Sequence, residues 1–316
     1  MKILLRQKSG LGNQLFQYAA GLYFAQRYAA ELEIIQEPKE LAVSYGHPRP
    51  FLLTKFSITA PVRHHGRRDR LFCSTAVHKR PLAHFARHIA RTQVYRPHFE
   101  TDWLFLSSLP VVSQTKAIYL DGYFQAHQYP TTVEPNLREH LALRDVPTGR
   151  NAEMLRQIQQ CEFPVSIHVR RGDYTTIHGG RDALPMSYYQ NSIQRIRQSI
   201  SRPTFFVFSD DIAFCKENLP PSKNYVFVDH NDETEAHEDL RLMSSCRHHI
   251  IANSTFSWWG AWLNPNSDKL VLVPDRWLDP NVPCPNLLPP TWHRIPTEYQ
   301  TDGIQSDPSA DDLTRT

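Results

Sequence analysis

Apolar runs alternate with helical periods along the second half of the chain, between residues 164 and 274. Five runs have the length and composition of buried strands, and we expect them at 164–169, 204–209, 225–229, 249–253 and 269–274. The segments between them repeat apolar positions at helical spacing, which predicts helices at 185–200, 211–219, 235–246 and 256–264. This alternation is typical of an α/β protein with a parallel, doubly wound sheet, whose ligand lies at the carboxyl ends of the strands.

The first half begins in the same way and then loses its pattern. We expect a strand at 2–6, a helix at 13–30 and a strand at 31–36, followed by an irregular, basic stretch that precedes the apolar run 117–124. Polar residues, Pro and Gly cluster at 145–152, which indicates a linker. The predicted units are an N-terminal domain 1–150, a C-terminal domain 151–296 and a flexible polar tail 297–316.

The bulk composition is that of a globular protein in a reducing compartment. A net charge of +3 on 316 residues is too small to indicate a nucleic-acid partner. Five widely spaced cysteines without a C-x-x-C pair favour free thiols over disulfides or zinc. The chain shows neither a membrane-spanning run nor a signal peptide, so we expect a cytoplasmic protein.

Charge is unevenly distributed, because the segment 62–96 carries nine basic residues and one acid, a net of +8. Such a segment predicts peripheral contact with an anionic membrane surface or with a lipid-linked acceptor. His84 and His88 have the i, i+4 spacing of metal ligands, but no Glu lies between them. We therefore interpret this pair as part of a solvated or membrane-facing basic surface, and we expect no metal site.

A glycine turn, "SGLGNQLF", joins the first strand to the first helix. Gly10 and Gly12 match the start of a dinucleotide-binding fingerprint, but Leu15 occupies the position of its third glycine. Asn13 and Gln14 stand at the helix N-terminus, where amides bind polar substrates or anions. A plain tight turn without a ligand is the alternative.

The strand end "SIHVRRGDY" places two arginines beside a histidine. Strand alternation puts His168 and Arg170 on one side and Arg171 on the other. Arginine is suited to bidentate contact with phosphate oxygens, and we expect Arg170 to bind the ligand. For Arg171 and Asp173, a structural ion pair across the turn is an equal alternative.

Polar residues also follow two other strands of the second half. In "FSDD", Ser209 and Asp210 are candidates for nucleoside contacts, whereas Asp211 stands where a helix N-cap belongs. Because this pair is not D-x-D, it does not indicate a divalent metal. Asp239 lies one turn into its helix and could accept a hydrogen bond from a base or ribose, or simply be an exposed acid.

The turn Asn253, Ser254 and Thr255 opens the helix that contains "FSWWGAWLN", where free N–H groups attract phosphate. N-capping by Ser254 is a compatible alternative. We expect the three tryptophans of this helix to pack it onto the sheet rather than to bind a sugar.

Together, "GLGNQLFQYAAGLYFA", "IHVRRGDY", "FSDD" and "NSTFSWWGAWLN" resemble the α-1,2-fucosyltransferases of glycosyltransferase family 11. The resemblance implies a GT-B architecture of two facing Rossmann-like domains. It also implies GDP-fucose as donor, a galactose 2-hydroxyl as acceptor, inversion of configuration, and no metal or other cofactor. One departure is the segment Ala213–Phe214, which lacks an expected aromatic–Cys pair.

The resemblance also assigns roles to residues. Arg170 would contact the β-phosphate, Asn13 would lie at the fucosyl–phosphate junction, and His168 and Asp239 would contact the nucleoside. The full set of candidates comprises catalytic Asn13, Arg170 and Asp173, acceptor-binding Gln14, and donor-binding Gly12, His168, Arg171, Ser209, Asp210, Asp239, Asn253, Ser254, Thr255 and Phe256. The base for the acceptor hydroxyl is left open between Asp173 and a donor phosphate oxygen. A nicotinamide-dependent oxidoreductase and a non-catalytic nucleotide- or glycan-binding protein are the alternative functions.

Overall fold

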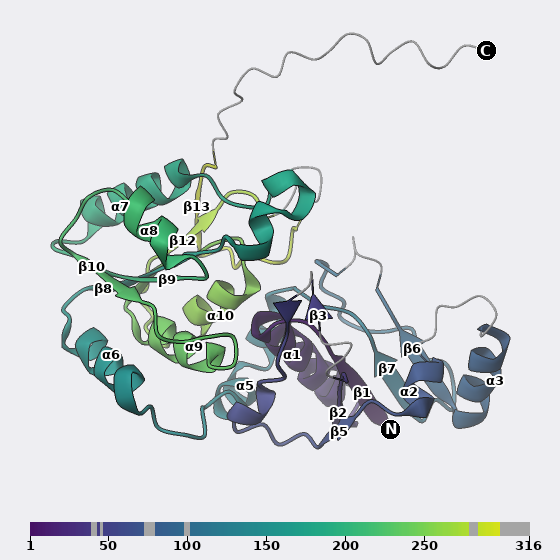
Figure 1. The fold of residues 1–316 in the computed structure, drawn as a ribbon. Coiled ribbons are helices and arrows are strands. Elements are labelled where there is room, and N and C mark those ends of the chain that lie inside the picture. Colours follow the sequence, from purple (N-terminus) through teal and green to yellow (C-terminus); the bar gives the residue numbers. More distant parts are fainter. Residues whose placement is uncertain (39–42, 45–46, 73–79, 98–101, 278–283, 298–316) are drawn as a thin grey trace, which may run out of the picture.

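Two parallel β-sheets, one from each half of the chain, form the framework of the protein (Figure 1). The computed structural model describes residues 1–297 except 39–42, 45–46, 73–79, 98–101 and 278–283. The N-terminal sheet has the strand order β5-β2-β1-β7-β6, and the C-terminal sheet has the order β10-β9-β8-β11-β12-β13. Every strand pair within these two sheets is parallel, as the alternating sequence pattern predicts.

The first half contains the strands of the N-terminal sheet, a separate pair of short strands, and the helices that connect them. Its strands are β1 (Lys2–Gln7), β2 (Glu31–Gln36), β3 (Val43–Ser44), β4 (His47–Pro48), β5 (Val62–His64), β6 (Thr92–Tyr95) and β7 (Ala117–Leu120). Its helices are α1 (Leu11–Arg27), η1 (Leu53–Lys55), α2 (Arg67–Phe72), α3 (Arg80–Ala90), α4 (Gln128–Thr132) and α5 (Glu134–His140). The strands β3 and β4 form a separate antiparallel pair.

The second half begins with α6 and alternates strands with helices to its end. Its strands are β8 (Pro164–Val169), β9 (Thr204–Ser209), β10 (Tyr225–Val228), β11 (His248–Ile250), β12 (Val271–Pro274) and β13 (His293–Ile295). Its helices are α6 (Gly149–Gln160), η4 (Gly172–Thr175), η5 (Ile177–Gly180), α7 (Met186–Ser199), α8 (Ile212–Asn218), α9 (Ala236–Ser245) and α10 (Thr255–Leu263).

The C-terminal sheet is covered on both faces, because successive strand residues point to opposite sides. In β9, Phe205 and Val207 belong to the core formed with α7 and α8. Phe206 and Phe208 belong to the opposite core, formed with α6 and α9. The same alternation in β8 leaves His168 on the α9 and α10 side, where the site lies.

A shared apolar core joins the two halves. Phe16 of α1 packs against the rings of Trp258 and Trp259 of α10, at centroid distances of 4.6 and 5.1 Å. Val271 and Val273 of β12 belong to the same cluster, so the tryptophans pack α10 onto the sheet as expected and also onto α1. The two helices face each other at the boundary between the halves (Figure 1).

Most predicted strands are present, although β11 and β12 are shorter than expected and β5, β6 and β13 were not predicted. Strands β2, β8 and β9 have the expected bounds, and α1 begins at Leu11 because Gly10 adopts the extended conformation of an N-cap. The stretch 62–96 is not irregular: it contains β5, α2, α3 and β6. The predicted linker 145–152 is helical from Gly149 onward. The domain bounds remain a prediction, and of the tail 297–316 the structure describes Thr297 alone.

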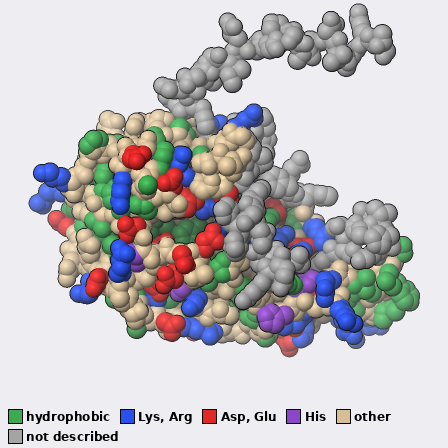
Figure 2. Space-filling model, in the orientation of Figure 1, with side chains coloured by type: hydrophobic (Ala, Val, Ile, Leu, Met, Phe, Trp, Pro, Cys, Tyr) green, Lys and Arg blue, Asp and Glu red, His purple; other side chains and the backbone are tan. Residues whose placement is uncertain are grey.

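Helix α3 presents an apolar stripe to solvent. Leu82, Phe85 and Ile89 are 59%, 61% and 67% exposed, whereas Ala83 is buried against the protein. Figure 2 shows the hydrophobic patch at the edge of the N-terminal half where Figure 1 places α3. Among the described residues, no helix combines the length and hydropathy needed to cross a bilayer.

Candidate functional site

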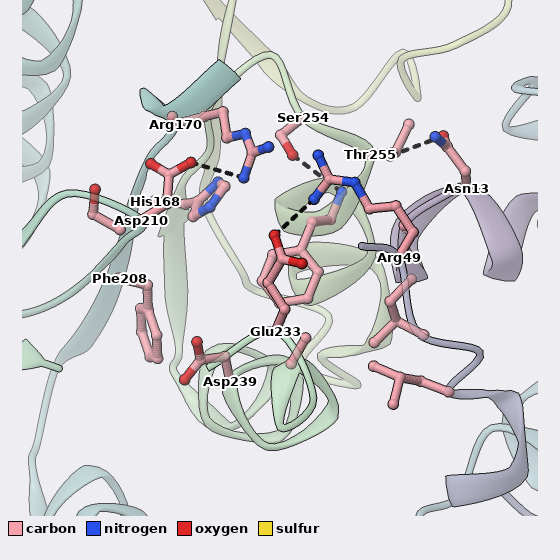
Figure 3. A pocket seen from close by; sticks show the side chains of 18 of the residues that line it. Asn13, Arg49, His168, Arg170, Phe208, Asp210, Glu233, Asp239, Ser254 and Thr255 are labelled. Carbon is pink, nitrogen blue, oxygen red and sulfur yellow. Dashed lines mark hydrogen bonds and ion pairs between the residues drawn. The ribbon is translucent and has the colours of Figure 1, made fainter. Parts of the chain in front are cut away.

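A cavity of about 600 Å³ lies between the two halves, at the carboxyl ends of strands β1, β8 and β9. The first half contributes the glycine turn 9–13 and a segment around Arg49. The second half contributes the ends of β8 and β9, the segment 231–233, helix α9 and the N-terminus of α10 (Figure 3). This is the edge of an open α/β sheet at which ligands are expected.

Gly12 allows the N-terminus of α1 to meet the N-terminus of α10. A Cβ at this position would lie 2.5 Å from the backbone nitrogen of Phe256 and 2.5 Å from the carbonyl carbon of Thr255. No side chain fits there, so the glycine is required by close approach of two backbones. The N-termini of both helices consequently line one cavity, and the positive ends of their dipoles suit an anionic ligand.

Asn13 is held by residues from three segments. Its Oδ1 accepts hydrogen bonds from Gln125 Nε2 at 2.6 Å and from Thr255 Oγ1 at 3.1 Å, while its Nδ2 donates to Ser9 Oγ at 3.0 Å. The Thr255 bond crosses between the halves (Figure 3). Asn13 lines the cavity as predicted. Gln125, which sequence reasoning missed, fixes its orientation.

Gln14, in contrast, does not line the cavity. Its side chain is buried, and its Nε2 donates to the carbonyl oxygens of Ser9 and Pro50 at 2.9 and 2.8 Å. Its Oε1 accepts from the N–H of Leu52 at 3.0 Å. The predicted acceptor contact is therefore corrected: Gln14 fastens the segment 50–52 to the glycine turn, and all its amide atoms are used in doing so.

The end of β8 separates its two arginines as the alternation predicts. His168 and Arg170 line the cavity. Arg171 points to the other face, where its guanidinium lies 3.4 Å from the ring centroid of Phe214 and 3.6 Å from Asp211 Oδ2. Arg171 therefore does not line the cavity, and its ion-pair partner is Asp211 rather than Asp173.

His168 is a neutral, buried side chain. Burial, reinforced by the charge of Arg170, lowers the pKa of His168 to about 3. Its ring packs edge-on against Phe256, and its Nδ1 has no hydrogen-bond partner among the described residues. A buried polar atom without a partner at a cavity wall is available to a ligand.

Asp173 lies between two guanidinium groups. Its Oδ1 accepts from Arg170 Nη2 at 2.6 Å, and its Oδ2 accepts from Arg49 Nη2 at 3.1 Å. Both oxygens are therefore engaged in charge-assisted hydrogen bonds. Because each oxygen already holds one guanidinium, the geometry fits a role in orienting Arg170 and Arg49.

Arg49 is a cavity residue that sequence reasoning missed. It reaches from the first half to Asp173 and, with Nη1, to Glu233 Oε1 at 2.9 Å in the second half (Figure 3). Its segment, "GHPRPF", has no periodicity and matches no motif. The only available signal was a lone arginine between two prolines, which stiffen the backbone on both sides.

Asp210 holds the other terminal nitrogen of the Arg170 guanidinium. Its Oδ2 lies 2.8 Å from Arg170 Nη1, and its Oδ1 accepts from the N–H of Arg171 at 2.9 Å. Burial opposes the charge of Arg170, but Asp210 and Asp173 outweigh it and raise the pKa of this guanidinium. Ser209 also lines the cavity, whereas Asp211 is the N-cap of α8, accepting from the N–H of Phe214 at 3.0 Å. The capping alternative for Asp211 is confirmed.

Asp239 stands on α9 at the opposite end of the cavity from Asn13. Its Oδ1 accepts a hydrogen bond of 2.7 Å from Asn231 Nδ2. Burial nevertheless raises the pKa of Asp239 to about 6, with a further contribution from Glu235 and Glu238. The exposed-acid alternative is therefore wrong, because Asp239 is largely buried in the cavity wall. A desolvated carboxyl in this position can accept a further hydrogen bond from a ligand.

The turn before α10 is divided between structure and cavity. Asn253 is buried, and its Nδ2 donates to the carbonyl oxygens of Asp182 and Trp277 at 2.9 Å each. It does not line the cavity, so its predicted donor contact is corrected to a role in holding the turn. Ser254, Thr255 and Phe256 do line it, and Ser254 Oγ accepts from the N–H of Phe256, which makes Ser254 the N-cap.

Sequence comparison identifies the family of this chain. The sequence model of Glycosyl transferase family 11 matches residues 4–283, which include every element that lines the cavity. The chain belongs to this family.

Curated relatives of this family 11 glycosyltransferase are bacterial and mammalian enzymes. The O-antigen biosynthesis glycosyltransferase WbnK of Escherichia coli is 31% identical, over 86% of this chain and 93% of WbnK. An α-1,2-colitosyltransferase of Escherichia coli is 30% identical, over 93% of this chain and 98% of that protein. The galactoside α-(1,2)-fucosyltransferase 1 of Bos taurus is 27% identical, over 81% of this chain and 64% of that protein.

Structural comparison confirms the GT-B architecture of this glycosyltransferase. The crystal structure of NodZ α-1,6-fucosyltransferase soaked with GDP-fucose matches with a TM-score of 0.51 at 16% identity. The match covers 84% of this chain and 92% of that chain. The two sheets therefore have the arrangement that the motifs predict.

Eleven of the fourteen predicted site residues line the cavity of this family 11 glycosyltransferase, and Arg171, Gln14 and Asn253 do not. The lining offers two guanidiniums, each paired with two carboxylates, together with two helix N-termini, a neutral histidine and the desolvated carboxyl of Asp239. Such a set can hold an anion in its middle and hydrogen-bond a polar ring at the Asp239 end.

Proposed function

We propose that the protein transfers L-fucose from GDP-β-L-fucose to the 2-hydroxyl of a galactose-containing acceptor, with inversion and without a metal ion. The observation that carries this proposal is the convergence of Arg170, Arg49 and the N-termini of α1 and α10 on one cavity. Fixed cations and N–H dipoles of this kind can take up the negative charge that grows on a departing diphosphate. The name of the bovine relative supports the sugar and the linkage.

In the proposed mechanism, the diphosphate lies between Arg170 and the turn 254–256. Asp173 and Asp210 hold the Arg170 guanidinium in place, so little reorganisation is needed as the sugar–phosphate bond breaks. Asn13, fixed by Gln125 and Thr255, would lie at the junction between sugar and phosphate. The nucleoside would extend toward His168 and Asp239, with Ser209 and Asp210 beside it.

Attack by the acceptor hydroxyl on the opposite face of the anomeric carbon would invert the configuration. Its proton would pass to an oxygen of the departing phosphate, while Asp173 keeps its contacts with Arg170 and Arg49. The acceptor would approach from the first half of the chain.

We further propose that the enzyme is cytoplasmic and contacts an anionic membrane surface through the basic segment 62–96. The buried thiols of Cys215 and Cys246, which form no disulfide, agree with that compartment.

Metal independence is part of the proposal. Among the described residues, no group of three or more His, Cys, Asp and Glu side chains could hold a metal ion. The two guanidiniums and the helix N-termini would supply the positive charge that a metal would otherwise bring. Turnover that is abolished by a chelator and restored by Mg²⁺ or Mn²⁺ would contradict this.

A GDP-release assay tests the proposed function. The purified protein is incubated with GDP-fucose and a β-galactoside such as lactose, and the product linkage is determined by NMR. We expect an α-1,2-linked fucoside. GDP-colitose should be assayed in parallel, because the colitosyltransferase relative is similar over almost its whole length. A preference for GDP-colitose would replace the donor sugar in the proposal, and release of no GDP from either donor would refute it.

A further inference from the structure

We propose that helix α3 is an interfacial anchor that inserts Leu82, Phe85 and Ile89 into an anionic lipid bilayer. Their spacing, i, i+3 and i+7, places the three side chains on a single helical face. All three are more than half exposed, although they are among the largest apolar side chains of the segment. Isolated exposed apolar residues need no explanation, but a contiguous stripe of them marks an interaction surface.

The rest of α3 explains why this face stays outside. Ala83 points toward the protein and is buried, and α3 packs against α2 and β6 through this narrower side. Arg87 also turns inward, since its guanidinium donates to the carbonyl oxygen of Phe72. The helix therefore uses small and polar contacts to attach itself to the domain, and it leaves its large apolar side chains unpartnered.

The charge around the stripe favours anionic lipid over other occupants. Arg67, Arg68 and Arg70 of α2 and Arg91 after α3 are all exposed, and His84 and His88 are exposed on α3 itself. The acid of this segment, Asp69, forms an ion pair with Arg63, with 2.5 Å between Asp69 Oδ2 and Arg63 Nη1. Figure 2 shows Lys and Arg side chains close to the hydrophobic patch. An apolar stripe with a basic surround is the composition of helices that lie in the headgroup region of anionic membranes.

This inference sharpens the proposed membrane contact by naming the helix and the side chains that enter the lipid. It does not depend on the donor or the acceptor, because α3 contributes no residue to the lining of the cavity. Its test can therefore succeed or fail independently of the transferase assay.

Vesicle flotation tests the anchor directly. The full-length protein should float with vesicles of phosphatidylcholine mixed with phosphatidylglycerol and should stay unbound with phosphatidylcholine alone. The variant Leu82→Ser/Phe85→Ser/Ile89→Ser should lower the partition coefficient by about tenfold or more, because three apolar side chains are removed from the bilayer. The matched control is Val112→Ser/Val146→Ser, which removes exposed apolar side chains elsewhere and should float like the wild type.

A second variant tests the electrostatic part. Arg67→Gln/Arg68→Gln/Arg91→Gln should weaken binding to anionic vesicles and reduce its sensitivity to salt, since surface charges are screened over about 10 Å at 0.1 M. Thermal unfolding and transfer to a soluble acceptor should match the wild type in all variants, which shows that they are folded.

Three results would overturn the proposal. They are a wild type that does not float with anionic vesicles, a stripe variant that floats as well as the wild type, and a wild-type dimer that the stripe variant converts to a monomer. The last result would assign the stripe to a second copy of the chain.

Discussion

Arg49 Nη2 lies 3.1 Å from Asp173 Oδ2, which joins the first half of the chain to the strand end that carries Arg170. The same guanidinium reaches Glu233, so one arginine side chain spans the mouth of the cavity. Asp173 in turn contacts Arg170 at 2.6 Å. Two cations from different halves are thus oriented by one carboxylate.

Replacing Arg49 with Ala should lower kcat/KM for the donor by about tenfold to a hundredfold, as expected for losing a charged hydrogen bond worth about 1.5–3 kcal/mol. The cause is the loss of one of the two cations beside the diphosphate. Steady-state kinetics with varied GDP-fucose measures the effect. Arg150→Ala, which breaks an exposed ion pair with Asp229 outside the cavity, is the matched control and should leave kcat/KM unchanged.

Arg170→Ala should reduce kcat by about a hundredfold to a thousandfold, the loss of about 2.7–4 kcal/mol that follows removal of one oxyanion donor. Arg170→Lys should recover little, since an ammonium group cannot contact Asp173, Asp210 and a phosphate in the fork geometry. Single-turnover kinetics separates this effect from donor binding. Near-wild-type turnover in either variant would show that Arg170 does not stabilise the leaving group.

Gly12→Ala should reduce turnover by about a hundredfold, because its Cβ would push the N-termini of α1 and α10 apart and displace Asn13. Gly10→Ala is a sharp control from the same turn. Its Cβ would meet nothing closer than Arg49 Cδ at 3.9 Å, and Gly10 has the backbone angles of an ordinary residue. It should cost helix α1 about 0.5–1 kcal/mol while leaving turnover nearly unchanged. Equal losses in the two variants would refute the close-approach argument.

Asp173→Asn distinguishes an orienting residue from a general base. An amide can still accept a hydrogen bond from one arginine, so we expect kcat to fall by about tenfold and the pH–rate profile to keep its shape. A pH series of kcat for both proteins provides the measurement. A residual kcat that is lower by about a thousandfold or more and no longer declines at low pH would identify Asp173 as the base instead.

Asp239 should make donor binding dependent on pH. Burial raises the pKa of Asp239 to about 6, and only the ionised carboxyl can accept from both Asn231 and a nucleoside donor. The donor KM should rise by about tenfold for each pH unit below about 6, and Asp239→Asn should show a higher donor KM that no longer changes with pH.

Stability provides an independent check on the same group. The pKa of Asp239 is higher in the folded chain than its ordinary value of 3.8, so the folded state binds more protons between pH 3.8 and about 6. Its contribution to the free energy of unfolding therefore falls as pH rises through this window. Above about pH 6, Asp239→Asn should unfold at a higher temperature than the wild type. A lower unfolding temperature would contradict the sign of the shift.

The second half was predictable because its strands are buried on both faces and its site residues follow them directly. Period-two alternation alone placed His168 and Arg170 toward the cavity and Arg171 away from it. Asn253 and Gln14 were misjudged because sequence shows a polar side chain in a turn but not whether backbone carbonyls already use its donors. Their neighbours Ser254 and Asn13, which are equally polar, do face the cavity.

The site residues and helices of the first half were harder to predict, because they depend on contacts between residues that are far apart in the sequence. Arg49 lines the cavity because Gln14 holds the adjacent segment 50–52 by hydrogen bonds, and such a contact between distant residues is not visible in the sequence. The helices α2 and α3 were not predicted, because arginines and histidines interrupt their apolar positions. In addition, the largest apolar side chains of α3 face solvent, whereas prediction from sequence assumes that the apolar face of a helix packs against the core.

The packing of Phe16 against Trp258 and Trp259 means that the two halves share one hydrophobic core, in addition to the cores of the second half itself. Severing the polypeptide between the two sheets would expose indole rings on one fragment and leave a void in the other. We therefore expect substrate entry and product exit to involve local rearrangements, such as release of the Arg49 contacts, rather than separation of the two halves.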